Sequence, residues 1–398
     1  MPSDNKTEYR GLPVLSVGFR PFYLMAALYG VIQIPVWVLL GQFQGIVPAQ
    51  TNPLLWHGHE TLFGFVGAFL GGFLLTATAD VTGRPPIRGG ALRVVVLVWL
   101  AGRLAWWIPN LSTDFAVLID LLFVPLLLGL ALPDLLEAKR PRTQLIVGTL
   151  IVYWIGNVLI HIEHFGWLAG TGVRGLHLSL DGLLLMIAVI GGRIVPMITA
   201  EALGDPNAQR TAPGWLDQAA IATLVLFIAV DVALPDSRVA GAAALLAGIA
   251  QLARQAYWGG ARTLDKPIVW IIHLAYLWLG LGLLAVAGAG LLKVFASSVG
   301  IHALSIGAVA TMILAAMTRE ALDHTGRKLV AGRFGVAAYL LITVAAVARI
   351  LAGAAVDTGA GRLLLEISGV AWTLAFAVYL CGYGRYLIGP QAHDTRSA

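Results

Sequence analysis

The stretch TLFGFVGAFLGGFLLTATA, residues 61–79, decides the class of fold. It contains no ionisable side chain, and a helix of this length rises about 28 Å, close to the roughly 30 Å hydrocarbon core of a bilayer. Because lipid offers no water to backbone polar groups, a crossing segment must pair them internally as a helix. The stretch therefore predicts a transmembrane helix.

Similar apolar runs fill almost the whole chain of 398 residues, which is 58% hydrophobic, 12% charged and has a mean hydropathy of +0.82. They predict an all-α, multi-pass membrane protein. We expect a segment over residues 1–19, one helical domain over 20–387 and a tail over 388–398. About twelve helices are predicted, over 20–41, 57–79, 91–109, 113–133, 143–169, 176–199, 215–234, 238–257, 267–290, 299–319, 331–351 and 361–387.

The basic residues predict the orientation. With both termini in the cytoplasm, 20 of the 26 lysines and arginines fall in inner loops and helix ends and 6 in outer ones, as the positive-inside rule requires. The positive charge is then expected to interact with anionic lipid headgroups, and nucleic acid is not an expected partner. A single cysteine, Cys381, excludes disulfides, a Cys-ligated iron–sulfur cluster and a CxxCH haem attachment.

Ionisable side chains gather at the predicted outer ends of the helices. The motif WHGHE, residues 56–60, opens the second predicted helix, and Asp120 and Asp231 also fall in outer thirds. A charge within a span costs at least about 2.5–3.5 kcal/mol and usually has a partner, so several at one depth indicate a shared site. Six of the nine histidines share this depth: His57, His59, His161, His164, His177 and His302.

Spacing limits how these side chains can be arranged. His177 and Asp181 are four residues apart on one helix face, so Asp181 is expected to hold the His177 ring. His57 and His59 are about 200° apart around a helix and should have different roles. Imidazoles without thiolates suit haem iron, copper, zinc or non-haem iron. A proton-coupled transporter would also place histidines and carboxylates at one depth. His273, in an inner third, is either structural or part of a separate inner group.

Four separated motifs then carry a resemblance. VGFRPFYLMAALYG (17–30), WHGHETLFGFVGAFLGGFLLTATADVTGRPP (56–86), GGRIVPMIT (191–199) and IHALSIGAVATMILAAMTREALDHTGR (301–327) together resemble the NnrS family of nitric-oxide-response membrane proteins. The resemblance implies a twelve-helix protein of the bacterial inner membrane that binds haem and copper and protects against nitric oxide, often alongside denitrification.

We also predict which residues bind these cofactors, from the depth of the histidines. A haem, b-type because no thioether motif exists, is expected to use His57 or His59 together with His302. Haem–copper oxidases, which also have twelve helices and use helices 2 and 10, offer a fold-level analogy. His161, His164 and His177 are then candidates for copper or a second haem. Further motif matches are His273 as a metal candidate and, as cofactor-binding candidates, Arg84, Arg193, Arg319 and Arg327.

The expected activity is capture or reduction of nitric oxide, and the sequence does not decide whether the protein is an enzyme. Reduction would consume protons, and Glu60, Glu163 and Asp181 are the relay candidates. A quinol or a small cytochrome would donate electrons. Two alternatives stay open: a haem sensor or scavenger without turnover, and a transporter of metal, haem or a small solute that uses the histidines and carboxylates as its path.

Overall fold

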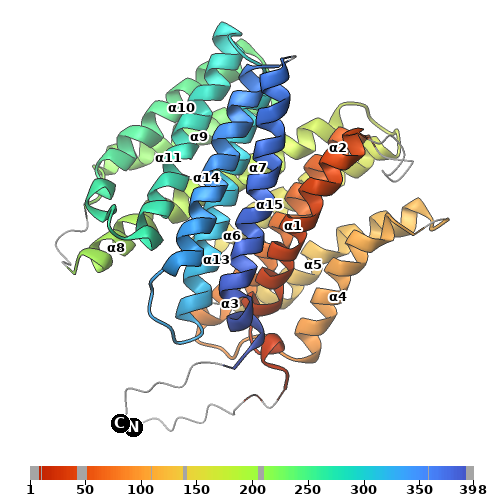
Figure 1. Ribbon diagram of the computed structural model, residues 1–398. Coiled ribbons are helices and arrows are strands. Elements are labelled where there is room, and N and C mark those ends of the chain that lie inside the picture. The colour runs from red at the N-terminus through yellow and green to blue at the C-terminus, as the bar shows by residue number, and fades with distance from the viewer. Residues whose placement is uncertain are drawn as a thin grey trace.

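The computed structural model confirms the all-helical prediction (Figure 1). It describes residues 9, 11–42, 52–108, 110–137, 141–204, 210–356 and 358–390, and no strand occurs among them. Residues 138–140 and most of the tail lie outside the described residues, as does the side chain of Arg142; among them are Lys139 and Arg140, which are counted with the predicted inner loops. The cytoplasmic placement of both termini stays a prediction.

Eleven helices in the described part of the chain are long and apolar enough to cross a membrane. Several contain more than one element, because short π-helical segments (η2, η3, η6 and η7) interrupt them. The spans are α1 (Phe19–Gln42); α2 (Pro53–His59), η2 (Glu60–Val66) and α3 (Gly67–Thr82); α5 (Thr113–Glu137); α6 (Pro141–His164); α7 (Thr171–Met186), η3 (Ile187–Gly191) and α8 (Gly192–Leu203); α9 (Gly214–Ala233); α10 (Arg238–Ala256); α11 (Pro267–Ala287) and η6 (Gly288–Leu292); α12 (Ser297–His302), η7 (Ala303–Ala310) and α13 (Thr311–Asp323); α14 (Gly332–Ala354); and α15 (Gly359–Ile388).

The remaining predicted span, 91–109, is shorter than expected. Helix α4 (Gly90–Ala105) has 16 residues and rises about 24 Å, less than the roughly 30 Å of hydrocarbon. The second helix, in contrast, begins earlier than predicted. Asn52 caps it by accepting hydrogen bonds from the backbone nitrogens of Leu54 and Leu55 at 2.9 and 3.5 Å, and Pro53 occupies the first turn.

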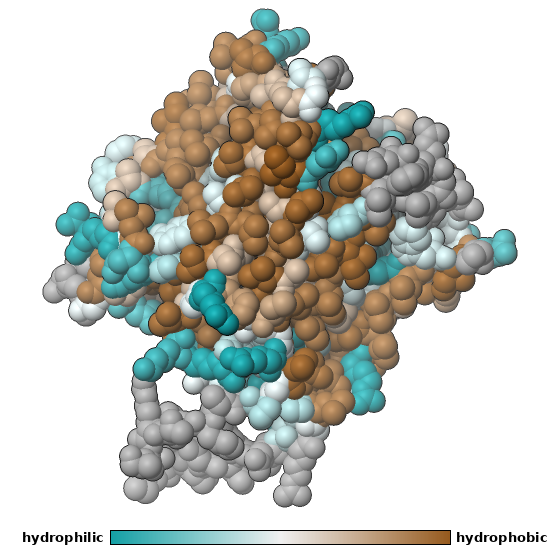
Figure 2. Space-filling view, in the orientation of Figure 1, coloured by the Kyte–Doolittle hydropathy of each residue, from teal (hydrophilic) through white to brown (hydrophobic). Residues whose placement is uncertain are grey.

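The two ends of the bundle differ in what they carry. At the terminal end, where α1 begins and α15 ends, Arg20 donates hydrogen bonds to the carbonyls of Leu387 and Gly389. At the opposite, distal end lie α2 and the starts of α7 and α12 (Figure 1). Apolar residues cover the middle of the face seen in Figure 2, and hydrophilic residues gather below it toward the terminal end. The chain is therefore a multi-pass membrane protein.

The π-helical segments widen four of the spans at defined places. Side chains from neighbouring helices bond carbonyls within them: Trp99 donates to Gly64 at 3.1 Å, Tyr153 to Leu62 at 2.6 Å and Arg254 to Ala188 at 2.7 Å. A π-segment changes the register of the helix and is frequent at functional sites. The first one starts at Glu60, directly after His59.

Small residues bring α6 and α7 into close contact. A Cβ added to Gly156 would lie 2.6 Å from the carbonyl oxygen of Gly175, and one added to Gly175 would lie 2.3 Å from that of Gly156. Neither position has room for a side chain, which is the usual reason for glycine between membrane helices. This contact fixes the distal half of α6, which carries Asn157 and His161.

Candidate metal centre

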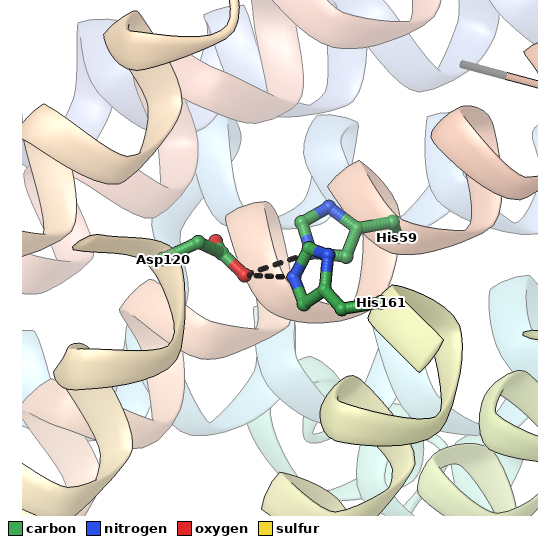
Figure 3. A group of neighbouring side chains, drawn as sticks. All are labelled: His59, Asp120 and His161. Atoms are coloured by element: carbon green, nitrogen blue, oxygen red, sulfur yellow. Dashed lines mark hydrogen bonds and ion pairs between the residues drawn. The ribbon is translucent and has the colours of Figure 1, made fainter. Parts of the chain in front are cut away.

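Three buried side chains from three helices meet in the distal half of the bundle. His59 comes from α2, Asp120 from α5 and His161 from α6, and the Nε2 atom of each histidine lies 3.0 Å from Oδ2 of Asp120. Figure 3 shows both imidazole rings beside the same carboxylate. One ligand atom from each residue lies within 4.8 Å of the other two, so the group has the donors and spacing to hold a metal ion.

The second ring nitrogen of His59 is also held. Nδ1 lies 3.0 Å from Oε1 of Glu60, the arrangement that fixes the ring of a metal-ligating histidine. Glu60 is fixed in turn by Arg103, whose Nη1 donates to both carboxylate oxygens at 3.1 and 3.2 Å, and by the hydroxyl of Tyr29. Arg103 also pairs with Asp120. The same carboxylates and guanidinium thus position both histidines.

An amide completes the polar cluster. Asn157, one turn before His161 on α6, donates from Nδ2 to Oδ2 of Asp120 at 2.8 Å. Its Oδ1 lies 3.0 Å from Nε2 of His59. Because each side chain has a partner from another helix, the cluster fixes α2, α4, α5 and α6 relative to one another.

The cluster lacks one positive charge when its imidazoles are neutral. Glu60 and Asp120 contribute two negative charges, and Arg103 contributes one positive charge. An uncompensated charge buried in a membrane protein is expensive. A proton on His59 or a bound cation between the histidines would restore neutrality, so the arrangement suits both proton storage and cation binding.

A cavity of about 240 Å³ adjoins the cluster. His59, His161 and His164 line it together with Glu60 and Glu163. Cofactor pockets usually occupy roughly 300–1,000 Å³, so this one suits an ion with a small ligand better than a macrocycle. The lining brings together five of the predicted site residues and gives the cluster an access route.

Two contacts between aromatic rings and one hydrogen bond to the backbone shape this cavity. The Trp106 ring is parallel to the His161 ring, with centroids 5.9 Å apart, and stands edge-on to the His164 ring at 5.4 Å. Glu163 accepts a hydrogen bond from the backbone nitrogen of Gly172 at 2.6 Å, which holds the turn between α6 and α7.

His57 and His302 lie apart from this cluster. The His57 ring stacks on Trp37 of α1 with centroids 4.5 Å apart, so it diverges from His59 as their spacing predicts. His302 uses Nδ1 to contact the carbonyl of Ser298 at 2.6 Å. Arg349 of α14 interacts electrostatically with both rings. Both histidines therefore lie outside the cluster of His59, Asp120 and His161.

The expected pairing of His177 with Asp181 is wrong. Nδ1 of His177 lies 2.5 Å from Oδ2 of Asp231, which reaches it from α9. Helical spacing places Asp181 on the same face of α7, but the carboxylate of a neighbouring helix is the actual partner. Asp181 lines a different cavity from Glu60 and Glu163, so the three relay candidates do not form one chain.

The predicted residues of the terminal half do not join the distal histidines. His273 lies 2.8 Å from the hydroxyl of Thr199. The four predicted arginines lie toward the terminal end. Arg84 pairs with Asp134 and Glu137, and Arg319 pairs with Glu201 at 3.2 Å. Arg327 lies over the Tyr386 ring, and Arg193 lines a wide cavity between α3, α6, α8 and α9. These arginines and His273 therefore lie apart from the distal histidines, and a cofactor role for the arginines stays a prediction.

Sequence reasoning placed Asp120 at the depth of the histidines but gave it no role, and it missed Arg103 and Asn157 as site residues. Asp120 and Arg103 carried a signal, because each is an ionisable side chain within an apolar segment. Asn157 carried none, since one amide in a membrane helix is common.

Comparison with known proteins agrees with the motifs. The family model described as NnrS protein matches residues 13–391. No curated protein matches the chain. The match covers nearly the whole chain and every side chain of the metal centre, and the chain therefore belongs to the NnrS family.

Proposed function

We propose that this protein binds copper at His59, Asp120 and His161 and a haem b through His57 and His302. With these metals it protects a bacterial cell against nitric oxide by capturing or reducing it. The site lies at the outer side of the inner membrane if the termini are cytoplasmic. The proposal rests on one observation: a buried cluster that lacks one positive charge places two imidazoles and a carboxylate beside a small cavity.

The donors at the first site suit copper. Imidazole nitrogen is a common ligand of copper, and the carboxylate adds an anionic oxygen. Glu60 and Arg103 would keep the ligands in place through their contacts with His59 and Asp120. A bound cation would also supply the missing positive charge. Copper would offer a centre to which nitric oxide can bind from the adjoining cavity.

The surroundings of His57 and His302 suit haem. The Nδ1 contact of His302 with the Ser298 carbonyl leaves Nε2 available as an axial ligand, the tautomer that such a contact selects. Arg349, which acts on both rings, can balance a haem carboxylate. A haem would supply an iron atom that binds nitric oxide.

Nitric oxide is a small apolar molecule that partitions into lipid, and a centre buried among membrane helices suits its capture. Reduction would additionally need protons and electrons. Glu60 and Glu163 both line the cavity at the copper site and can pass protons toward it. A quinol or a small cytochrome is the expected electron donor.

A transporter is the second candidate, and the cavities favour it. The distal cavity of about 240 Å³ reaches the His59 cluster, and a cavity of about 460 Å³ extends through the terminal half to Asp80, Arg319 and Glu320. Ionisable side chains that line cavities among membrane helices commonly mark a substrate, ion or proton pathway. Uptake of copper or haem into vesicles containing the protein would distinguish this function from retention at fixed sites.

Optical spectroscopy tests the haem part of the proposal. Purified protein is expected to show a Soret band that shifts when nitric oxide is added to the reduced form. His57→Ala and His302→Ala should each lower the haem content severalfold, because each removes one axial ligand. His393→Ala, in the tail, is the control. A protein without a Soret band, or with full haem in both variants, would refute the assignment.

A further inference from the structure

A second cavity, mostly apolar but with several ionisable side chains in its wall, lies at the distal end between α7, α9, α10 and α12. Its volume is about 30 Å³, enough for an ion or one or two waters but not for an organic molecule. His177, Asp181 and Asp231 line its buried part, and Asp236 lies at its exposed edge. It shares no lining residue with the cavity of the first metal site.

An imidazole in this cavity is already oriented by a carboxylate. Nδ1 of His177 lies 2.5 Å from Asp231, whose side chain is 6% exposed. When Nδ1 donates to a carboxylate, Nε2 is the unprotonated nitrogen and becomes a metal ligand. Asp231 thus fixes both the tautomer and the direction of the His177 ring.

A second carboxylate lines the same cavity, and one of its oxygens is unpaired among the described residues. Asp181 is 2% exposed, and within the described residues its Oδ2 atom has no hydrogen-bond partner. Nearly all buried polar side chains are hydrogen-bonded, and an intramembrane carboxylate normally has a partner. Asp181 lies one turn after His177 on the same face of α7, so an ion in the cavity can meet both side chains.

Another wall of the cavity consists of backbone atoms of α10 and η6 that lie in close contact with each other. A Cβ on Gly241 would lie 3.1 Å from the backbone nitrogen of Leu291, and one on Gly290 would lie 3.1 Å from Cα of Gly241 and from the carbonyl oxygen of Ser237. Both glycines line the cavity. At these two positions α10 and η6 touch through glycine backbone, so neither position offers Asp181 a side-chain donor.

We propose that this cavity binds one divalent transition-metal ion, with Nε2 of His177 and the carboxylate of Asp181 as protein ligands and water completing the coordination. Asp231 is a positioning residue that holds the imidazole. When the imidazole is neutral and both carboxylates are ionised, the group carries two negative charges, which a divalent ion balances. The mixed nitrogen and oxygen donors favour ions such as manganese or zinc over calcium. The site is additional to the copper and haem of the proposed function.

Manganese is the probe, because it is paramagnetic and accepts this donor set. Purified full-length protein without added copper is titrated with Mn²⁺, and a His59→Ala variant shows whether any of the bound Mn²⁺ occupies the first site. We expect one bound Mn²⁺ whose pulsed electron paramagnetic resonance spectrum contains one imidazole nitrogen. Asp181→Asn should weaken Mn²⁺ binding at least about tenfold, and Asp231→Asn should weaken it while one imidazole nitrogen stays coupled. Asp114→Asn, exposed at the same end, should change nothing.

Several results would overturn the proposal: no bound Mn²⁺, no coupled imidazole nitrogen, unchanged affinity in a folded Asp181→Asn protein, or Ca²⁺ binding as tight as Mn²⁺. The spectrum of the unmodified protein decides the matter if the variants do not fold. Failure of the first copper site is recognised separately, because it appears as copper loading that does not depend on Asp120.

Discussion

Asp120→Asn is expected to lower the affinity for copper at least about 100-fold. Loss of a group that only orients a ligand typically costs roughly 10–100-fold in metal affinity, and Asp120 is itself a proposed ligand. The substitution keeps the size of the side chain but removes the negative charge that faces both Nε2 atoms and Arg103. Copper affinity is measured by competition with a chelator of known affinity.

Asp114→Asn is the matched control for Asp120→Asn. Both residues belong to α5, but Asp114 is exposed in its first turn and Asp120 is buried. The control should bind copper like the unmodified protein. Equal affinity in the two variants would show that copper, if bound, lies elsewhere.

Arg103→Met is expected to lower the free energy of unfolding by about 3–5 kcal/mol, the usual cost of removing one partner from a buried ion pair. The variant leaves Glu60 and Asp120 buried without their guanidinium. Arg84→Met is the control, because Arg84 also pairs with two carboxylates but is 44% exposed. Exposed pairs are screened by water and contribute little to stability.

Reversible unfolding in detergent, monitored by circular dichroism, measures both arginine variants in protein without added metal. A large loss for Arg103→Met and a small one for Arg84→Met would establish that the buried cluster stabilises the bundle. Equal losses would contradict the structural role assigned to Arg103, and they would leave the metal affinity of the histidines to be tested separately.

The sequence predicted the helices well because the signal is local. A run such as residues 61–79 is apolar over the thickness of a bilayer, and nothing else in the chain is needed to recognise it. The ends of helices were less accurate, since they depend on caps such as Asn52. The shortness of α4 was missed because hydropathy continues into the turn after Ala105.

The partners within the site could be predicted only in part, because they depend on contacts between helices. Spacing along one helix predicted that His57 and His59 diverge, and they do. It also suggested Asp181 as the partner of His177, whereas Asp231 of α9 takes that place. Which face of α5 or α9 turns toward the histidines depends on packing at glycines and on π-segments, which leave no clear periodic signal.

X-ray absorption at the copper edge tests the central claim most directly, because it reports which atoms surround the metal. Protein loaded with copper is expected to show two imidazole ligands and at least one oxygen ligand, and His59→Ala and His161→Ala should each lose one imidazole. Sulfur in the coordination sphere, or an unchanged spectrum in both variants, would contradict a copper site formed by His59, Asp120 and His161.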